Sequence, residues 1–447
     1  MSVAEVARRI RAGALTPREA VEAYLERIEQ VDGALNAYIS VRAEEALAEA
    51  DHVPDGPLRG VPLAVKDVID VAGVPTTAGS KILAGNVAAR DATCVERLRR
   101  AGAIVLGKLN THEFAFGAMT TSPHFGAAHN PWALDRICGG SSGGSGAAAA
   151  ADLAAGTLGT DTAGSIRIPA CFCGVTGLRP TTGLVPTSGV VPVSWSLDTV
   201  GPISRSAADC ALLLSALTGE PYDLIESVRE LRIGVVDELF RRADPAVAAQ
   251  AHAAVDELRG LGASIESVDV PLLEESGTIN QLLMLTEAAE VHLPWLRTRL
   301  ADYGDDVRAR LLAGLLLPGT AHVTGLRARR WFCDELRTVF ERVDLLAAPE
   351  MPVVAPLIGE TEVEVNGERM PYRLSLIPFN SPWNLAGVPV ASVPAGFVDG
   401  LPLGLALIGR PRDEQTVLQA AHTFQCATDW HERRPPPVEI RTAAPSV

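Results

Sequence analysis

The chain reads Gly139-Gly140-Ser141-Ser142-Gly143-Gly144-Ser145-Gly146 at one glycine-rich turn and Gly159-Thr160-Asp161-Thr162-Ala163-Gly164-Ser165-Ile166-Arg167 at a second. Glycine allows backbone angles and close approaches that other residues resist, so both turns are suited to presenting serine hydroxyls. A flexible Gly/Ser linker is a poor interpretation, because the apolar, helix-forming run Ala147–Ala151 follows the first turn directly. We therefore interpret the two turns as parts of one reactive site.

A lysine upstream of these turns lies in unusual surroundings. A serine hydroxyl is a poor nucleophile at neutral pH and needs a base within hydrogen-bond reach. Lysine can be that base only where burial lowers its pKa, because desolvation disfavours the ammonium form. Lys66 lies inside the apolar, strand-like segment Val61–Ile69, which would desolvate it. We predict that Lys66 is a general base and not a solvated surface charge.

The order and spacing of these three pieces resemble the amidase signature family, whose members hydrolyse carboxamides with a Ser–cis-Ser–Lys triad. The likeness continues without a break through residues 168–181, and a weaker likeness covers about residues 5–425. It implies that Lys66 is the base and that Ser141, after a cis peptide bond, relays the proton. It also implies that Ser165, 24 positions beyond Ser141, is the nucleophile.

The same resemblance implies an oxyanion hole in the second turn. Its donors would be the backbone N–H groups of Thr162, Ala163, Gly164 and Ser165. Ala163 stands where the family commonly has glycine, and its Cβ would be strained if the position needs a positive φ. Cys138 and Cys171 are further departures from small or hydroxyl side chains. None of these departures removes a catalytic group.

Two other interpretations of the first turn are weaker. Residues 139–144 match G-x-S-x-G twice, with Ser141 or Ser142 as the central serine of an α/β-hydrolase elbow. That elbow needs a preceding buried strand, whereas Asn130–Cys138 is predicted to be a loop, and no suitable histidine follows between residues 145 and 320. A phosphate-binding loop is disfavoured because no Gly-Lys-Ser/Thr follows.

Alternation of strand-like and helix-like segments predicts an α/β fold, with a large, mixed and mostly buried β-sheet sandwiched between helices. Thr16-Pro17-Arg18-Glu19 is a capping box that opens a helix. Further helices are predicted at residues 92–100, 206–217, 244–261 and 415–428, and strands at 103–106, 231–236, 263–270, 343–349, 388–395 and 403–408.

Length and composition favour one large enzyme domain. The 447 residues, 47% of them hydrophobic, can bury a substantial core. We expect a single domain over residues 1–432, with a catalytic core at about 60–210 and a helix-rich, substrate-side region at about 272–340. A Pro-rich tail is expected over residues 433–447. A net charge of −15 argues against direct binding of nucleic acid.

No cofactor and no metal are expected. The seven cysteines are scattered without paired metal-ligand spacing, and His112-Glu113 lacks a second histidine at helical distance. Such cysteine usage fits a reducing compartment. No membrane span and no signal peptide are indicated, so we expect a cytoplasmic protein, monomeric or homodimeric, that acts on a small molecule.

Substrate choice depends on less regular segments. Five side chains are candidate pocket residues by resemblance, namely Phe116, Met119, Trp195, Phe379 and Trp383. They suggest small, apolar or aryl amides, or carbamates (urethanes) or esters. Arg167 and Asp198 could bind a substrate or move a proton, but a structural ion pair or a turn cap is the favoured interpretation for both.

Two further functions stay open at this stage. The chain could be the glutaminase component of a tRNA-dependent amidotransferase, which shares the same triad and passes ammonia to a partner. The departures at Ala163, Cys138 and Cys171 favour a stand-alone amidase over that alternative. A catalytically silent binding protein is disfavoured, because all three residues of the triad are present.

Overall fold

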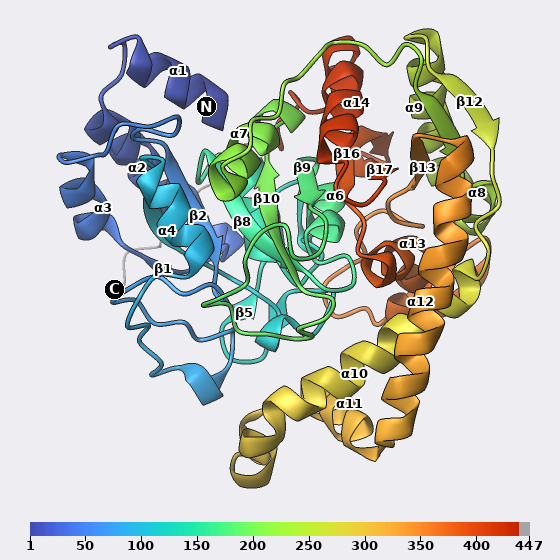
Figure 1. Cartoon of the computed structure of the whole chain (residues 1–447). Coiled ribbons are helices and arrows are strands. Elements are labelled where there is room, and N and C mark those ends of the chain that lie inside the picture. The colour runs from blue at the N-terminus through green and yellow to red at the C-terminus, as the bar shows by residue number, and fades with distance from the viewer. Residues whose placement is uncertain (438–447) are drawn as a thin grey trace.

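One mixed β-sheet of eleven strands runs through the whole molecule (Figure 1). The structure is a computed structural model that describes residues 1–437, so most of the predicted tail, residues 438–447, lies outside the described residues. The strand order is β1-β3-β2-β8-β10-β9-β16-β17-β13-β11-β12. Pairing is parallel among β3, β2 and β8 and among β13, β11 and β12, and antiparallel elsewhere. The predicted α/β class with a large mixed sheet is confirmed.

The strands follow chain order only in part, so segments distant in the sequence meet in the sheet. The first six are β1 (Tyr38–Val41), β3 (Ile104–Leu109), β2 (Pro62–Lys66), β8 (Gly156–Asp161), β10 (Thr199–Ser204) and β9 (Thr176–Arg179). The other five are β16 (Val390–Val398), β17 (Leu401–Gly409), β13 (Leu345–Pro349), β11 (Arg232–Val235) and β12 (Ser264–Ser267). Every residue of β2, β3 and β8 is buried, as expected for strands that are covered on both faces.

Helices at the N-terminus pack beside the β1 end of the sheet (Figure 1). They are α1 (Val3–Arg11), α2 (Pro17–Leu35), α3 (Ala43–Ala50) and α4 (Thr93–Arg100). The predicted capping box is present, because the Thr16 side chain accepts from the Glu19 amide while the Glu19 carboxylate bonds back to the Thr16 amide. Satisfying amides that would otherwise lack a partner fixes where α2 begins.

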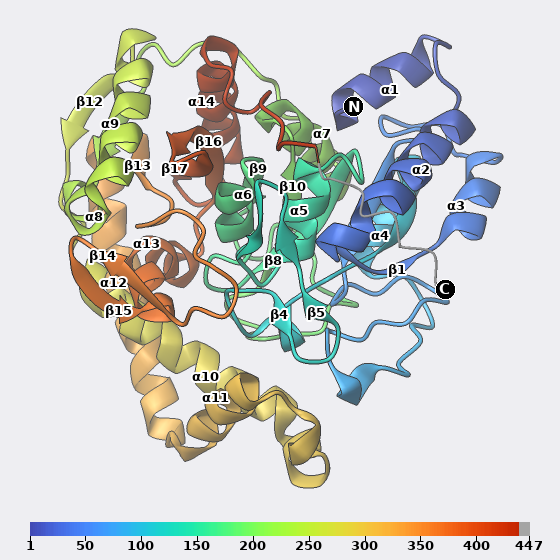
Figure 2. The ribbon, with the colours of Figure 1, turned by 180° about the vertical axis from the view of Figure 1, so that it is seen from behind.

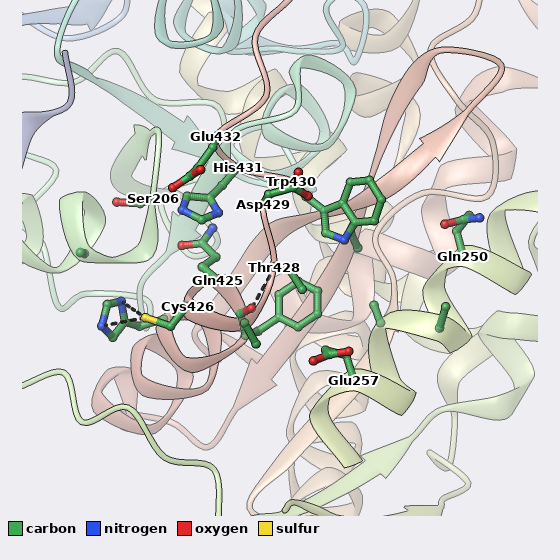
Figure 3. A pocket seen from close by; sticks show the side chains of 17 residues that line it. Ser206, Gln250, Glu257, Gln425, Cys426, Thr428, Asp429, Trp430, His431 and Glu432 are labelled. Atoms are coloured by element: carbon green, nitrogen blue, oxygen red, sulfur yellow. Dashed lines mark hydrogen bonds between the residues drawn. The ribbon is translucent and has the colours of Figure 1, made fainter. Parts of the chain in front are cut away.

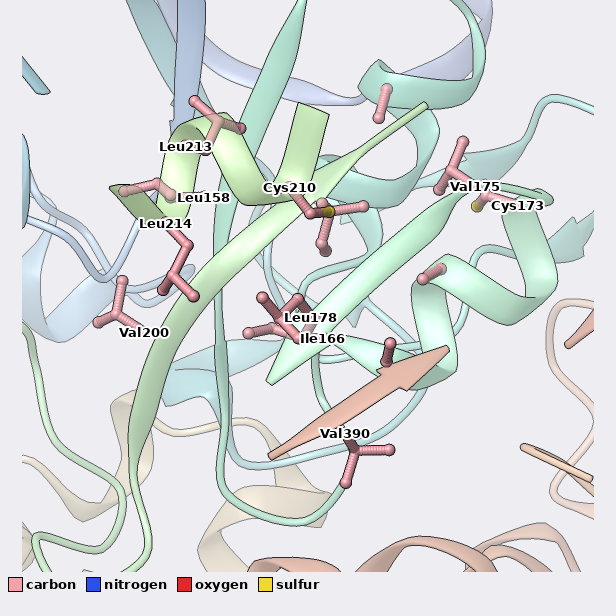
Figure 4. Packing of buried hydrophobic residues seen from close by; sticks show 14 of the residues in the cluster. Leu158, Ile166, Cys173, Val175, Leu178, Val200, Cys210, Leu213, Leu214 and Val390 are labelled. Carbon is pink, nitrogen blue, oxygen red and sulfur yellow. The ribbon is translucent and has the colours of Figure 1, made fainter. Parts of the chain in front are cut away.

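Helices on opposite sides cover the middle strands. In Figure 1, α7 (Ala207–Thr218) lies in front of β10, and in the reverse view of Figure 2, α5 (Gly143–Ala150) lies in front. Figure 4 shows Leu213 and Leu214 of α7 beside Leu158 and Val200 of the strands. All four are buried, and burying a leucine or valine stabilises the fold by about 1.5–3 kcal/mol.

The remaining helices lie toward the second half of the sheet or extend from it. They are α6 (Arg167–Cys173), α8 (Asp237–Arg242), α9 (Pro245–Gly260), α13 (Tyr372–Ala386) and α14 (Glu414–Ala427). Three more, α10 (Leu273–Thr298), α11 (Asp305–Leu316) and α12 (Gly319–Arg342), form an arm that extends from the sheet in both views (Figures 1 and 2). No helix in residues 1–437 is long and apolar enough to cross a membrane.

Two local predictions differ from the structure. The segment Asn130–Cys138 was expected to be a loop, but Ala133–Ile137 is strand β7, which pairs with β6 (His129–Asn130). This hairpin is separate from the large sheet, so β7 is not the central strand that an α/β-hydrolase elbow needs. The strand predicted at 263–270 is shorter, Ser264–Ser267, because only four residues pair with β11.

Candidate active site

The two serine turns meet at one edge of the sheet. Strand β8 ends at Asp161, and the second turn leads from there into α6 at Arg167. The Gly140–Ser141 peptide bond in the first turn is cis, as the resemblance implies, and α5 begins two residues later at Gly143. The amide of Ser142 donates to the carbonyl of Ser165 over 3.2 Å, which ties the two turns directly to each other.

Lys66 ends β2, the strand beside β8, and is fully buried. Its Nζ lies 2.7 Å from Ser141 Oγ and 2.8 Å from Thr160 Oγ1. Burial lowers the pKa of Lys66 from its usual 10.5 to about 7, while the charges of Asp198 and Asp161 oppose that shift. A substantial fraction of the amine is therefore neutral near pH 7 and can accept a proton from the Ser141 hydroxyl.

Asp161 holds the second turn in place. One carboxylate oxygen accepts from the Gly164 amide at 2.8 Å, and the other accepts from the Ile166 amide at 3.2 Å. Arg167 pairs with the same carboxylate at 3.1 Å, and Asn384 donates to it at 2.6 Å. Although burial opposes ionisation, these partners together with Arg179 keep the pKa of Asp161 well below its usual range.

The backbone angles of the second turn show whether an alanine at position 163 is strained. The positive φ, 108°, belongs to Gly164, and Ala163 is not among the non-glycine residues with positive φ. Alanine at 163 is therefore unstrained in this turn, whereas a Cβ on Gly164 would collide with the side chain of Asn380.

The four amides predicted to form an oxyanion hole differ in whether they already donate a hydrogen bond. Gly164 already donates to Asp161. Within the described residues, the amides of Thr162, Ala163 and Ser165 donate no hydrogen bond. Those three are therefore the donors that remain available to a substrate oxygen.

Ser142 and Ser165 differ in what their side chains contact. Ser142 is fully buried, and its hydroxyl bonds to the carbonyl and amide of Thr160 at 3.2 and 3.3 Å. Ser165 is 8% exposed and lines a cavity together with Thr162 and Ala163. This placement presents Ser165 to a substrate and assigns Ser142 a bracing role.

Arg167 and Asp198 make structural contacts. Arg167 is fully buried between Asp161 and Glu350, with a 3.3 Å ion pair to Glu350. Asp198 accepts from the Thr162 hydroxyl at 2.5 Å and from the amides of Val193 and Ser194. Burial raises the pKa of Asp198 to about 6. The contacts of Arg167 and Asp198 therefore agree with the structural ion pair and turn cap predicted from the sequence.

The cavity at Ser165 is small, with a volume of about 40 Å³. A larger cavity of about 480 Å³ lies next to it, and the two share Gly117, Ala118, Arg310 and Arg373 as lining residues. The two cavities therefore lie side by side, with these four residues between them.

Two arginines line both cavities. Arg310 pairs with Asp306 and stacks over the Phe116 ring, 4.3 Å from its centroid. Burial, together with the charge of Arg373, lowers the pKa of Arg310 to about 10, against the effect of Asp306. The Nη1 atom of Arg373 is buried and has no hydrogen-bond partner among the described residues.

The five candidate pocket residues end up in different places. Phe116 lines the cavity at Ser165, and Met119 lines the larger cavity beside it. Trp195 is 62% exposed, and Phe379 and Trp383 are core residues, with the Trp383 indole donating to the Phe379 carbonyl. The structure brings neither Trp195, Phe379 nor Trp383 to the cavity at Ser165.

Sequence reasoning missed several residues of this site. Thr160 and Asn384 act through single hydrogen bonds to Lys66 and Asp161, and nothing in their local sequence indicates such contacts. Arg310 and Arg373 come from helices α11 and α13, which only the tertiary fold brings beside Ser165.

Comparison with known proteins gives consistent results. The family model described as Amidase matches residues 19–418. A Glutamyl-tRNA(Gln) amidotransferase component from Moorella thermoacetica is 39% identical, over 94% of this chain and 95% of the relative. The component of the same name from Methanosarcina mazei is 38% identical, over 98% and 99% of the two chains.

Solved structures show the same fold. One belongs to a vestigial protein complex that reveals the evolutionary origins of an s-triazine catabolic enzyme; it is 37% identical, with a TM-score of 0.91 over 95% of this chain and 98% of that chain. A bacterial aryl acylamidase of the amidase signature family is 27% identical, with a TM-score of 0.88 over 97% and 98% of the two chains.

Proposed function

The chain belongs to the amidase signature family, and from that premise we propose that it hydrolyses a C–N bond through an acyl-enzyme on Ser165. Neutral Lys66 accepts the Ser141 proton while Ser141 accepts the proton of Ser165, whose oxygen attacks the amide carbonyl. The developing oxyanion is bound by the free amides of the second turn. Protonation of the leaving amine through the same path breaks the C–N bond, and water then hydrolyses the ester.

We further propose that the substrate is a small amide that carries a carboxylate. The observation behind this proposal is the buried, unpartnered Nη1 of Arg373 in the wall of the Ser165 cavity. A buried donor without a partner costs about 1–3 kcal/mol, a cost that a carboxylate oxygen would remove. Asp306 pairs with Arg310, whereas Arg373 makes no ion pair within residues 1–437.

A substrate that carries a carboxylate fits the alternative function, the glutaminase component of an amidotransferase, better than it fits an aryl amidase. The amidotransferase relatives support an amide donor such as glutamine, which has both a carboxamide and a carboxylate. By the same likeness, we propose that this chain acts together with a partner protein. The positions of Trp195, Phe379 and Trp383 outside the cavity remove most of the motivation for an aryl substrate.

An aryl amide remains the second candidate, supported by the likeness to the aryl acylamidase and by Phe116 in the cavity wall. Carbamates and esters would follow the same acyl-enzyme route. Seven free cysteines support our proposal of a reducing, cytoplasmic compartment.

A substrate pair tests the proposal. Ammonia release from glutamine is compared with release from butyramide, which has a similar chain but no carboxylate, and with cleavage of an aryl amide. We expect Arg373→Met to lower kcat/KM for glutamine by tenfold or more, or about 1.4 kcal/mol, and to leave butyramide nearly unchanged. Arg369→Met, at an exposed arginine of β15 (Glu368–Pro371), is the matched control.

Equal losses for glutamine and butyramide would assign Arg373 a structural role and withdraw the carboxylate proposal. An aryl amide rate that exceeds the glutamine rate in wild-type protein would favour the second candidate.

A further inference from the structure

Helix α14 carries a histidine and a cysteine on one face, remote from Ser165. His422 and Cys426 are four positions apart, so they lie on the same side of the helix. Figure 3 shows the Cys426 sulfur directed at an imidazole ring, which is that of His422. The carboxylate of Glu226 approaches from the loop between α7 and β11. None of the three lines the cavity at Ser165.

The three ligand atoms are close enough together to surround one metal ion, since all of them lie within 4.8 Å of one another. Cys426 Sγ lies 3.6 Å from His422 Nε2, and that nitrogen lies 3.9 Å from Glu226 Oε1. Zn–S of about 2.3 Å and Zn–N of about 2.0 Å at a tetrahedral angle give an S···N separation of about 3.5 Å, and a carboxylate ligand gives an N···O separation of about 3.4 Å. Cys426 Sγ lies 3.9 Å from His422 Nδ1, almost as near as to Nε2, so the sulfur faces the imidazole between its two nitrogens. The His422 ring and the Glu226 carboxylate therefore both have to turn toward the ion.

The loop is held over the helix on both sides of Glu226. Gln419 donates to the Ser227 carbonyl at 2.7 Å, and Thr423 donates to the Ile225 carbonyl at 3.3 Å. One turn earlier, Gln415 accepts from the Asp223 amide at 3.1 Å. The backbone that carries Glu226 is therefore fixed on α14 before any ion binds, which reduces the entropy lost on binding.

We propose that Glu226, His422 and Cys426 bind a divalent zinc ion, with water as the fourth ligand. A thiolate, an imidazole and a carboxylate are all zinc ligands, and the thiolate disfavours magnesium and calcium. Binding displaces the thiol proton to solvent. The ion joins the connection between the two halves of the sheet to α14, so its role is to fix that connection and not to take part in hydrolysis.

Sequence patterns for metal sites do not identify this group, because Glu226 lies 196 positions before His422 and a His-x-x-x-Cys pair alone is a weak signal. Within the described residues, no other group of three such side chains has its ligand atoms this close together.

Cobalt(II) tests the site in the full-length protein, because it takes the same ligands and absorbs light. Chelator-treated, reduced protein is titrated with Co²⁺ and then with Zn²⁺ in competition. We expect one ion per chain, a thiolate-to-cobalt charge-transfer band in the near ultraviolet, and loss of that band when zinc is added.

Variants identify the ligands. Cys426→Ser should abolish the charge-transfer band, and His422→Ala and Glu226→Gln should each weaken zinc binding by tenfold or more. The controls are Cys333→Ser, at a partly buried thiol of α12, and His431→Ala, a nearby histidine outside the cluster. Both controls should bind like wild type, and zinc should raise the Tm of wild type but not that of Cys426→Ser.

The proposal is overturned if Co²⁺ gives no thiolate band in wild type, or if Cys426→Ser binds zinc as tightly as wild type. Amidase activity serves as an independent measurement: it should persist in the chelator-treated protein, and a loss that zinc restores would contradict the structural role assigned to the ion.

Discussion

Lys66 and Lys108 are both fully buried, on the paired strands β2 and β3, yet they have different surroundings. Lys108 Nζ lies 3.0 Å from a carboxylate oxygen of Asp67 and donates to Thr76 Oγ1 at 2.8 Å. Lys66 contacts only the hydroxyls of Ser141 and Thr160 and makes no ion pair within residues 1–437. Burial lowers the pKa of both, but only Lys108 has a contacting carboxylate that opposes the shift.

The pleat of β2 produces this difference. Val65 is the register partner of Lys108, and Lys66 is the partner of Leu109. Paired residues of adjacent strands share a face and successive residues alternate, so Lys66 and Lys108 point to opposite faces of the sheet. Asp67, beyond the strand end, pairs with Lys108 and not with its sequence neighbour.

The surroundings of the two lysines show what makes a buried lysine a base. Burial alone is not sufficient, since a contacting carboxylate favours the charged form. A lysine that is desolvated and surrounded by hydroxyls can exchange protons near neutral pH, whereas a lysine in a buried ion pair stays charged, and its removal leaves its partner carboxylate buried and unpaired.

The largest effect is expected when the hydroxyl of the proposed nucleophile is removed. Ser165→Ala should abolish turnover and covalent labelling by a fluorophosphonate, with losses of several orders of magnitude, while the protein stays folded. Ser142→Ala is the matched control, since its hydroxyl bonds only to Thr160. If labelling persists in Ser165→Ala and disappears in Ser142→Ala, then the nucleophile is Ser142.

Lys66 and Ser141 should act as one unit. Lys66→Met and Ser141→Ala are each expected to lower kcat by about a thousandfold or more, and the double variant should be little worse than either single one. The measurement is a double-mutant cycle on kcat. Multiplicative losses in the double variant would show that the two groups act independently.

Lys108 should matter for stability instead. Lys108→Met leaves the Asp67 carboxylate buried without its ion-pair partner, which should lower the free energy of unfolding by about 3–5 kcal/mol. Denaturant titration measures this loss, and adding Asp67→Asn should recover much of it. The folded Lys108→Met protein should keep a kcat close to that of wild type; a collapse of kcat would erase the contrast between the two lysines.

The smallest effect is expected in the pH profile. With the pKa of Lys66 near 7, the neutral fraction and hence kcat/KM should rise about tenfold from pH 6 to pH 8. The charge of Asp198 raises that pKa, so Asp198→Asn should move the midpoint to lower pH, and Lys108→Met should leave it in place. A profile that peaks near pH 5 and falls above it would exclude a neutral lysine base.

Much of the fold could be predicted from the sequence, because its signals are local. The capping box at Thr16 and Glu19 and the helix after Ser206 depend on contacts three or four residues apart, and both formed as expected. The hairpin at residues 129–137 was missed because its first strand, His129–Asn130, has only two residues and the hairpin belongs to no larger sheet.

The family, the α/β class and the burial of Lys66 could be inferred from local sequence, since the two serine turns and the apolar strand lie within short, contiguous segments. The pairing of Asp67 with Lys108, and the presence of Arg373 rather than Trp195 or Trp383 in the cavity wall, follow only from the folded arrangement. Those outcomes depend on strand register and on helices far away in the chain. Neither can be read from local sequence, because the free energy that fixes them comes from long-range packing.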